Sequence, residues 1–221
     1  MFPCNCCGLR TLAGPAPGCY DICPVCSWED DPIQSEDNNY AGGANRISLK
    51  TARANDITQG ACKSESLTLV RLPTAAEVTE WLPSSDPELR EVLDVGLRRA
   101  LVNTARSIRS GETDVIEACY SVVQLSYGLT ESERYSQPLL TFIGIASELD
   151  DYPRGEVRKE WEVSALAQLD AEFSDYIATV LPRMHSACEE LETKFAGFLP
   201  ARLRLAPFGE DGLSPTRPKS I

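Results

Sequence analysis

Residues 4–26 read CNCCGLRTLAGPAPGCYDICPVC and contain two C-x-x-C pairs, which decide how the N-terminal part of this chain can fold. Cys4 and Cys7 form the first pair, 15 residues follow, and Cys23 and Cys26 form the second. A C-x-x-C turn places two sulfur atoms on one side of a tight loop, so two facing loops complete a tetrahedron around Zn²⁺. The spacing therefore predicts one structural zinc ion held by Cys4, Cys7, Cys23 and Cys26, with no coordination position left for a substrate.

Other uses of these cysteines remain open. Cys6 and Cys19 are surplus to the predicted set, and the spacing also permits a C-x-C pairing of Cys4 with Cys6. Disulfides are a weaker alternative because the total of nine cysteines is odd, and a redox-active C-x-x-C usually lies in a βαβ unit, which this sequence does not resemble. After the first pair, Gly8 permits the positive φ that turns backbone N–H groups toward sulfur, whereas Ser27 fits the equivalent place less comfortably.

Charge and composition restrict the possible partners. The 221 residues carry a formal net charge of -12, and residues 61–200 alone hold 24 acidic and 13 basic side chains. Such a chain repels nucleic acid and anionic lipid, and it suits a basic protein partner better. No apolar run approaches the roughly 18 residues that a membrane span needs, and the N-terminus lacks the basic start of a signal peptide. We expect a cytoplasmic protein with no membrane or nucleic-acid partner.

From residue 86 the sequence changes to long amphipathic stretches, which predict helices. Asp86 and Pro87 are typical of an N-cap and first helical residue, and Gly111 is expected to end that helix. An apolar stripe over 115–123 predicts a second helix that ends near Gly128, and another stripe predicts a helix that begins near Pro138. A short helix is expected to carry Trp161 and Leu166. The longest stripe predicts a helix from Phe173 to Phe195, kinked at Pro182. Short connections favour an antiparallel bundle. The repeated Pro and Gly from Pro200 onward predict an extended or partly disordered tail.

The N-terminal motifs resemble a known family. CNCCG, CPVCSWEDD and NNYAGGANRISLKTARAN, together with Gly60-Ala61-Cys62 and Val70-Arg71-x-Pro73, closely resemble the bacterial cysteine-rich CPCC domain over roughly residues 2–75. The resemblance implies a compact metal-binding module and brings no catalytic residues. Two positions depart from the family pattern: Asn5 replaces a usual proline, and Asp56 stands where an aromatic residue is usual. Within this module Ser48 is expected to cap a short helix from Leu49 to Asn55.

We therefore predict an α+β chain: a four-cysteine, zinc-ribbon-like module with small β elements and one short helix in residues 1–75, an all-α bundle in 76–199, and a tail in 200–221. The sequence holds a single histidine, His185, so no Ser/His/Asp set or Cys/His dyad is expected, and we predict that the protein is not an enzyme.

The expected function is binding of another protein. The helical part resembles uncharacterised helical domains of small bacterial proteins, and the whole resembles bacterial immunity proteins, which implies neutralisation of a cognate toxin with a basic surface. The main alternative is a zinc-dependent regulatory or adaptor protein with an endogenous target. A hydrolase that uses the acidic turn at Asp150 and Asp151 is the third.

Overall fold

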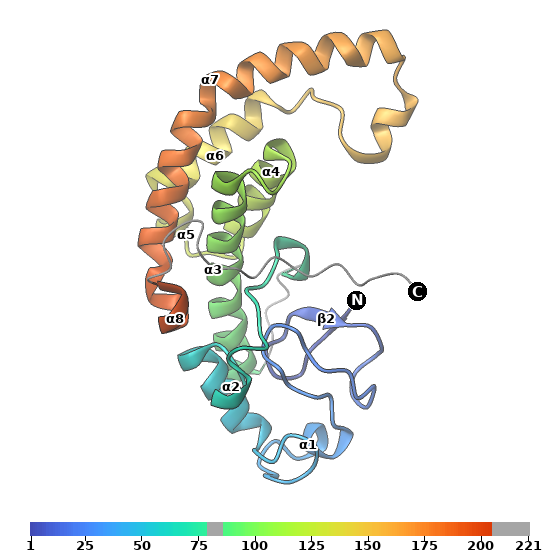
Figure 1. Ribbon diagram of the computed structural model, residues 1–221, viewed down its shortest axis with the longest axis vertical. Coiled ribbons are helices and arrows are strands. Elements are labelled where there is room, and N and C mark those ends of the chain that lie inside the picture. Colours follow the sequence, from blue (N-terminus) through green and yellow to red (C-terminus); the bar gives the residue numbers. More distant parts are fainter. Residues whose placement is uncertain (79–85, 205–221) are drawn as a thin grey trace.

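The computed structural model describes residues 1–78 and 86–204, and it places a small N-terminal module at one end of a helical region (Figure 1). Strands β1 (Phe2–Pro3) and β2 (Arg10–Leu12) form an antiparallel two-stranded sheet. The module continues through helices α1 (Pro32–Glu36) and α2 (Leu49–Gln59) and the 3-10 turns η1 (Ser64–Ser66) and η2 (Ala75–Glu77). The expectation of small β elements is confirmed. The expectation of one helix is wrong, because Asp31 caps a second one by accepting hydrogen bonds from the backbone N–H groups of Ile33 and Gln34.

Helix α2 begins where the sequence predicted. The Ser48 side chain accepts a hydrogen bond from the backbone N–H of Thr51, as an N-cap does. The helix continues past Asn55 for about one further turn, because the first glycine that can stop it is Gly60, in the left-handed conformation with φ 83°.

Four long helices and one short helix make up most of the described chain from residue 86 to residue 195. Helix α3 (Pro87–Ser110) has Asp86 as its N-cap and Gly111 as its left-handed C-cap, as predicted. The others are α4 (Val115–Ser126), the short α5 (Glu131–Arg134), α6 (Gln137–Glu148) and α7 (Val163–Phe195). The colours in Figure 1 show that α3, α4, α6 and α7 alternate in direction, so the mostly helical region is an antiparallel bundle. Their facing apolar side chains, including Leu101, Val122, Phe142, Ile145, Met184 and Leu191, form its core.

The start of α7 differs from the sequence prediction. Residues Gly155–Glu160 form the 3-10 turn η3, Trp161 lies after it, and Leu166 belongs to α7 rather than to a separate short helix. The reason is local, because the Glu162 side chain accepts hydrogen bonds from two backbone N–H groups of the next turn and so starts the long helix at Val163. The helix runs through Pro182, and Figure 1 shows that α7 is curved.

The end of the chain also differs from the prediction. After the 3-10 turn η4 (Ala196–Phe198), residues Ala201–Arg204 form helix α8 instead of an extended segment. The side chain of Arg204 supports this turn by donating to the carbonyl oxygens of Leu199 and Gly197. The rest of the predicted tail, residues 205–221, lies outside the described residues. No helix in the described ranges has both the length and the apolar character that crossing a membrane requires.

Helix α3 belongs to two hydrophobic cores. Its first turns bring Val92, fully buried, and Leu93 against the cysteine-rich module, whose own core includes Leu9 and Trp28. From Leu97 onward the apolar face of α3 belongs to the core of the bundle. Because one continuous helix serves both cores, the cysteine-rich module is fixed directly to the bundle.

Candidate metal centre

The two C-x-x-C pairs fold into two turns with the same backbone pattern. In the first turn, the N–H of Gly8 donates to the carbonyl of Cys4 at 2.7 Å, and the N–H of Cys4 donates to the carbonyl of Leu9 at 2.9 Å. In the second, the N–H of Ser27 donates to the carbonyl of Cys23 at 2.8 Å, and the N–H of Cys23 donates to the carbonyl of residue 28 at 2.9 Å. We call these turns the first knuckle (residues 4–9) and the second knuckle (residues 23–28).

Both knuckles need a left-handed residue directly after their second cysteine. Gly8 has φ 74°, as expected, and Ser27 adopts the same conformation with φ 62° although its side chain disfavours it. One backbone amide points at sulfur, as expected of such turns: the N–H of Val25 lies 3.4 Å from the Sγ of Cys23. The two knuckles therefore share a left-handed residue at the same position and the same pair of backbone hydrogen bonds.

The structure brings the four predicted ligands together. The Sγ atoms of Cys4, Cys7, Cys23 and Cys26 all lie within 4.8 Å of one another, and all four residues are buried. The Sγ distances between Cys4 and Cys26 and between Cys7 and Cys23 are both 3.7 Å. A tetrahedral zinc ion with Zn–S bonds of about 2.3 Å separates its sulfur ligands by about 3.8 Å. Two of the six Sγ separations match this value and the others do not exceed 4.8 Å, so the group suits one tetrahedral metal ion.

The thiols of this group differ in pKa. Hydrogen bonds from Cys26, Cys4 and Cys7, and a further one from Thr11 at 3.0 Å, hold the pKa of Cys23 well below its usual range. Burial raises the pKa of Cys26 well above its usual value. A divalent cation must displace the protons of its cysteine ligands, so metal affinity is expected to fall as the pH falls.

The two surplus cysteines lie outside this group. Cys6 is buried beside it, and burial raises the pKa of its thiol to about 11, but the group contains Cys7 in the position that the alternative C-x-C pairing gave to Cys6. Cys19 is partly exposed, and its backbone N–H donates to the carboxylate of Asp30 at 2.9 Å. The geometry thus favours the C-x-x-C pairing over the C-x-C alternative.

The two knuckles are covered by different parts of the chain. At the first, a Cβ atom added to Gly8 would lie 2.6 Å from Leu93 Cδ2, and one added to Gly96 would lie 3.3 Å from Leu9, so this knuckle packs directly on α3. At the second, the N–H of Cys62 donates to the carbonyl of Cys26 at 2.7 Å, a bond within the module itself. The candidate metal centre therefore lies within the module, with its first knuckle packed against α3.

The comparison with known families bears on this region alone. Residues 2–77 match the family model Cysteine-rich CPCC. The match confirms the resemblance read from the motifs and leaves the helical region outside it. Comparison with curated proteins found no match, and comparison with solved structures found none.

The other shared motifs of this CPCC module have structural roles. Asp30 accepts hydrogen bonds from the N–H groups of Gly18 and Cys19, at 2.6 and 2.9 Å, and so closes the loop between the knuckles. Asn45 exchanges hydrogen bonds of 2.9 and 2.8 Å with the backbone of Glu29. These buried amides and carboxylates satisfy loop backbone groups that have no partner in a sheet or helix.

Both residues that depart from the family pattern make polar contacts. The Asn5 side chain donates to Ser35 Oγ at 2.7 Å. The backbone carbonyl of Asn5 accepts two hydrogen bonds from the guanidinium of Arg53, which also pairs with Asp86 at 2.8 Å. Asp56 is buried on α2 and pairs with Arg99 of α3. The two unusual residues thus lie where the CPCC module meets the helical region.

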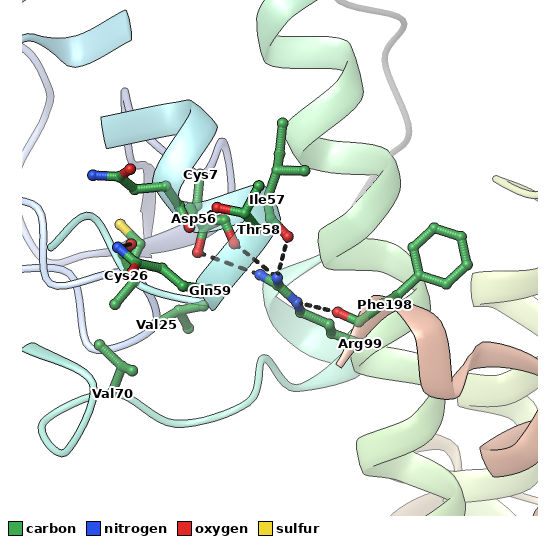
Figure 2. A network of polar contacts seen from close by, with 12 residues as sticks. Cys7, Val25, Cys26, Asp56, Ile57, Thr58, Gln59, Val70, Arg99 and Phe198 are labelled. Atoms are coloured by element: carbon green, nitrogen blue, oxygen red, sulfur yellow. Dashed lines mark hydrogen bonds and ion pairs between the residues drawn. The ribbon is translucent and has the colours of Figure 1, made fainter. Parts of the chain in front are cut away.

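Figure 2 shows how Arg99 joins three elements. Its guanidinium donates to the Asp56 carboxylate at 3.3 Å and to the carbonyl oxygens of Asp56 and Ile57, at the end of α2, at 2.7 and 3.1 Å. Its Nε donates to the carbonyl of Phe198 in η4 at 2.9 Å. Burial raises the pKa of Asp56 to about 6 against the opposing effect of Arg99. Sequence reasoning missed this pair, although the unusual Asp56 was the available signal.

Proposed function

We propose that Cys4, Cys7, Cys23 and Cys26 hold one structural zinc ion. The observation that carries this proposal is the buried group of four Sγ atoms at separations that suit tetrahedral Zn–S geometry. Zinc bound there would cross-link the two knuckles and stabilise the folded module. Since all four ligands come from the protein, the site suits a structural rather than a catalytic ion.

Metal analysis of the purified chain tests this proposal. We expect one zinc ion per chain and loss of that ion in Cys23→Ser. Cys19→Ser is the matched control, because Cys19 lies in the same loop region but outside the thiol group. A metal content far below one per chain, or equal zinc content in the two variants, would contradict a four-cysteine zinc site.

We further propose that the protein is not an enzyme and acts by binding another protein. The net charge of -12 supports a basic partner, because electrostatic complementarity speeds association and selects against acidic competitors. The direct contact of the CPCC module with α3 supports a rigid body with a fixed binding surface. Neutralisation of a toxin is the specific form of this proposal, and a regulatory or adaptor role is the alternative.

Affinity purification of the tagged, zinc-loaded chain from its own cells tests the binding proposal. We expect one basic protein at near-equal stoichiometry, and for the toxin hypothesis we expect that expression of this partner alone arrests growth and that co-expression of the chain restores it. A partner that does not impair growth favours the regulatory alternative. The absence of any stoichiometric partner would contradict both forms.

A further inference from the structure

The segment of residues 150–179, which we call the arm, extends beyond α4 and α6 at the end of the bundle far from the CPCC module (Figure 1). It consists of the loop that contains η3 and the first half of α7. The loop folds back on the helix: the rings of Tyr152 and Phe173 contact edge to face at 4.8 Å, and Asp170 accepts hydrogen bonds from Tyr152 at 2.8 Å and from Arg158 at 2.8 and 3.0 Å. These contacts give the arm a defined shape.

The arm is not part of the bundle core. In the described structure, no residue of α7 before Val180 is buried, whereas Met184, Cys188 and Leu191 further along the helix are fully buried. Phe173, Tyr176 and Ile177 are only partly buried and pack against the edge of the core, whereas residues 163–172 belong neither to the core nor to the side chains packed against it. A helical segment outside the core gains little stability from its own sequence. The chain therefore maintains about three turns of helix, residues 163–172, outside its hydrophobic core.

The tip of the arm exposes large apolar side chains. Val157, Trp161 and Val163 lie within seven residues of one another and are 55%, 41% and 80% exposed. Exposed large apolar side chains grouped along one short segment are a feature of interaction sites. An exposed tryptophan on an ordered segment is also the residue type that most often dominates a protein interface.

The arm that carries these side chains is acidic. Residues 150–179 hold eight acidic and three basic side chains, a net charge of -5 out of -12 for the whole chain. Asp170 and Glu156 pair with Arg158 and Lys159, and Asp150 and Glu160 form no ion pair with another described residue. A second copy of the chain would bring two such charges together, which disfavours self-association through this surface.

We propose that the arm is the docking surface, with Trp161 as its anchor, for a protein whose apolar pocket is ringed by lysine and arginine side chains. The proposal rests on the proposed protein-binding function and assigns it a place on the molecule. Burial of Val157, Trp161 and Val163 supplies the apolar contact, and the acidic side chains of the arm face the basic ring of the partner. The partner thus contacts the end of the molecule opposite the zinc centre.

The test uses the full chain with a photo-crosslinking residue at one exposed position at a time in its own cells. Ala165 lies on the arm beside Trp161, whereas Leu69 and Tyr135, 74% and 57% exposed, lie on the CPCC module and on the bundle. We expect one cross-linked partner from Ala165 and none from the two control positions. Purification of that partner then allows direct titration of the unmodified chain, with Trp161→Ser and Glu160→Lys as variants.

We expect the dissociation constant to rise at least ten-fold for Trp161→Ser and by a similar factor for Glu160→Lys at low salt. The zinc content and the helicity of both variants should be unchanged. Cross-linking from Leu69 or Tyr135 but not from Ala165 would overturn the arm as the docking surface while leaving protein binding intact. No cross-link from any position would contradict protein binding itself. Cross-linking of two copies of this chain through Ala165 would overturn the proposal that the arm binds a basic partner.

Discussion

The first and second knuckles have the same backbone, but different parts of the chain enclose them. Each contains C-x-x-C, a left-handed residue and the same pair of backbone hydrogen bonds. In the first knuckle the left-handed residue is Gly8, covered by Leu93 of α3, and in the second it is Ser27. Local sequence thus determines the shape of a knuckle, whereas its tertiary neighbours determine which residue types each position tolerates.

Loss of the metal is expected to give the largest effect, and it should destabilise the two knuckles equally. Cys7→Ser and Cys23→Ser each remove one of four ligands, and binding of a structural zinc ion is worth on the order of 10 kcal/mol to the folding of such a module. We expect either variant to lose its zinc and the cooperative unfolding of the CPCC module, while α4 and α6 keep their helicity. Metal analysis combined with hydrogen exchange measures both effects.

Treatment of the unmodified chain with a chelator is the companion experiment, because it removes the ion without changing a side chain. Hydrogen exchange in the two knuckles should increase together. If only one knuckle lost protection, they would not share one ion, and the structural equivalence of the pair would be broken.

The contact between the CPCC module and the bundle is expected to give the next largest effect. Arg99→Met leaves Asp56 buried without its charged partner and removes a donor from three carbonyl groups. Breaking a buried ion pair from one side typically costs about 3–5 kcal/mol. We expect a loss of that size in the free energy of unfolding of the zinc-loaded chain, measured in urea.

The double variant Asp56→Leu with Arg99→Met serves as the control. Replacing both members of a buried pair by apolar residues is often nearly neutral, so the double variant should be more stable than Arg99→Met alone. If it were as unstable as the single variant, the carbonyl groups of Ile57 and Phe198, rather than the charge of Asp56, would be the important partners of Arg99.

Some of this architecture follows from the sequence because its signals are local. The limits of α3 follow from Asp86, Pro87 and Gly111, whose backbone preferences operate within one helical turn. The cysteine group follows from the spacing of two C-x-x-C pairs. The ends of α3 and each C-x-x-C turn are determined by residues that are neighbours in the sequence.

The rest depended on contacts between distant residues. Arg99 and Asp56 are 43 positions apart, and no periodicity links them, so only the unusual carboxylate on α2 gave a signal. The prediction of a separate helix around Trp161 was wrong for a different reason. Its apolar residues suggested a helix buried in the bundle, whereas they lie on the arm, outside the core. Amphipathic spacing does not distinguish a face that packs inside the molecule from one that remains exposed.

The third prediction separates backbone strain from packing at the first knuckle. Gly8→Ala combines a left-handed alanine with a Cβ atom 2.6 Å from Leu93 Cδ2, and we expect it to destabilise the chain by about 2–4 kcal/mol. Gly111→Ala is the matched control, because φ there is 72° and no atom lies within 4 Å of the added Cβ. Gly111→Ala should lower the free energy of unfolding by only about 1–2 kcal/mol. Equal losses in urea unfolding would show that α3 does not press on the first knuckle.

The smallest expected effect concerns the second knuckle and has the opposite sign. Ser27 already holds a left-handed conformation that glycine adopts without strain, so Ser27→Gly should stabilise the zinc-loaded chain by about 0.5–1 kcal/mol. The gain is less than the full relief of strain because glycine also makes the unfolded chain more flexible. The melting temperature of the zinc-loaded variant measures it, with unchanged zinc content as the control. A loss of stability would mean that the Ser27 side chain makes a stabilising contact, and that the two knuckles, alike in backbone, differ in what their left-handed residues do.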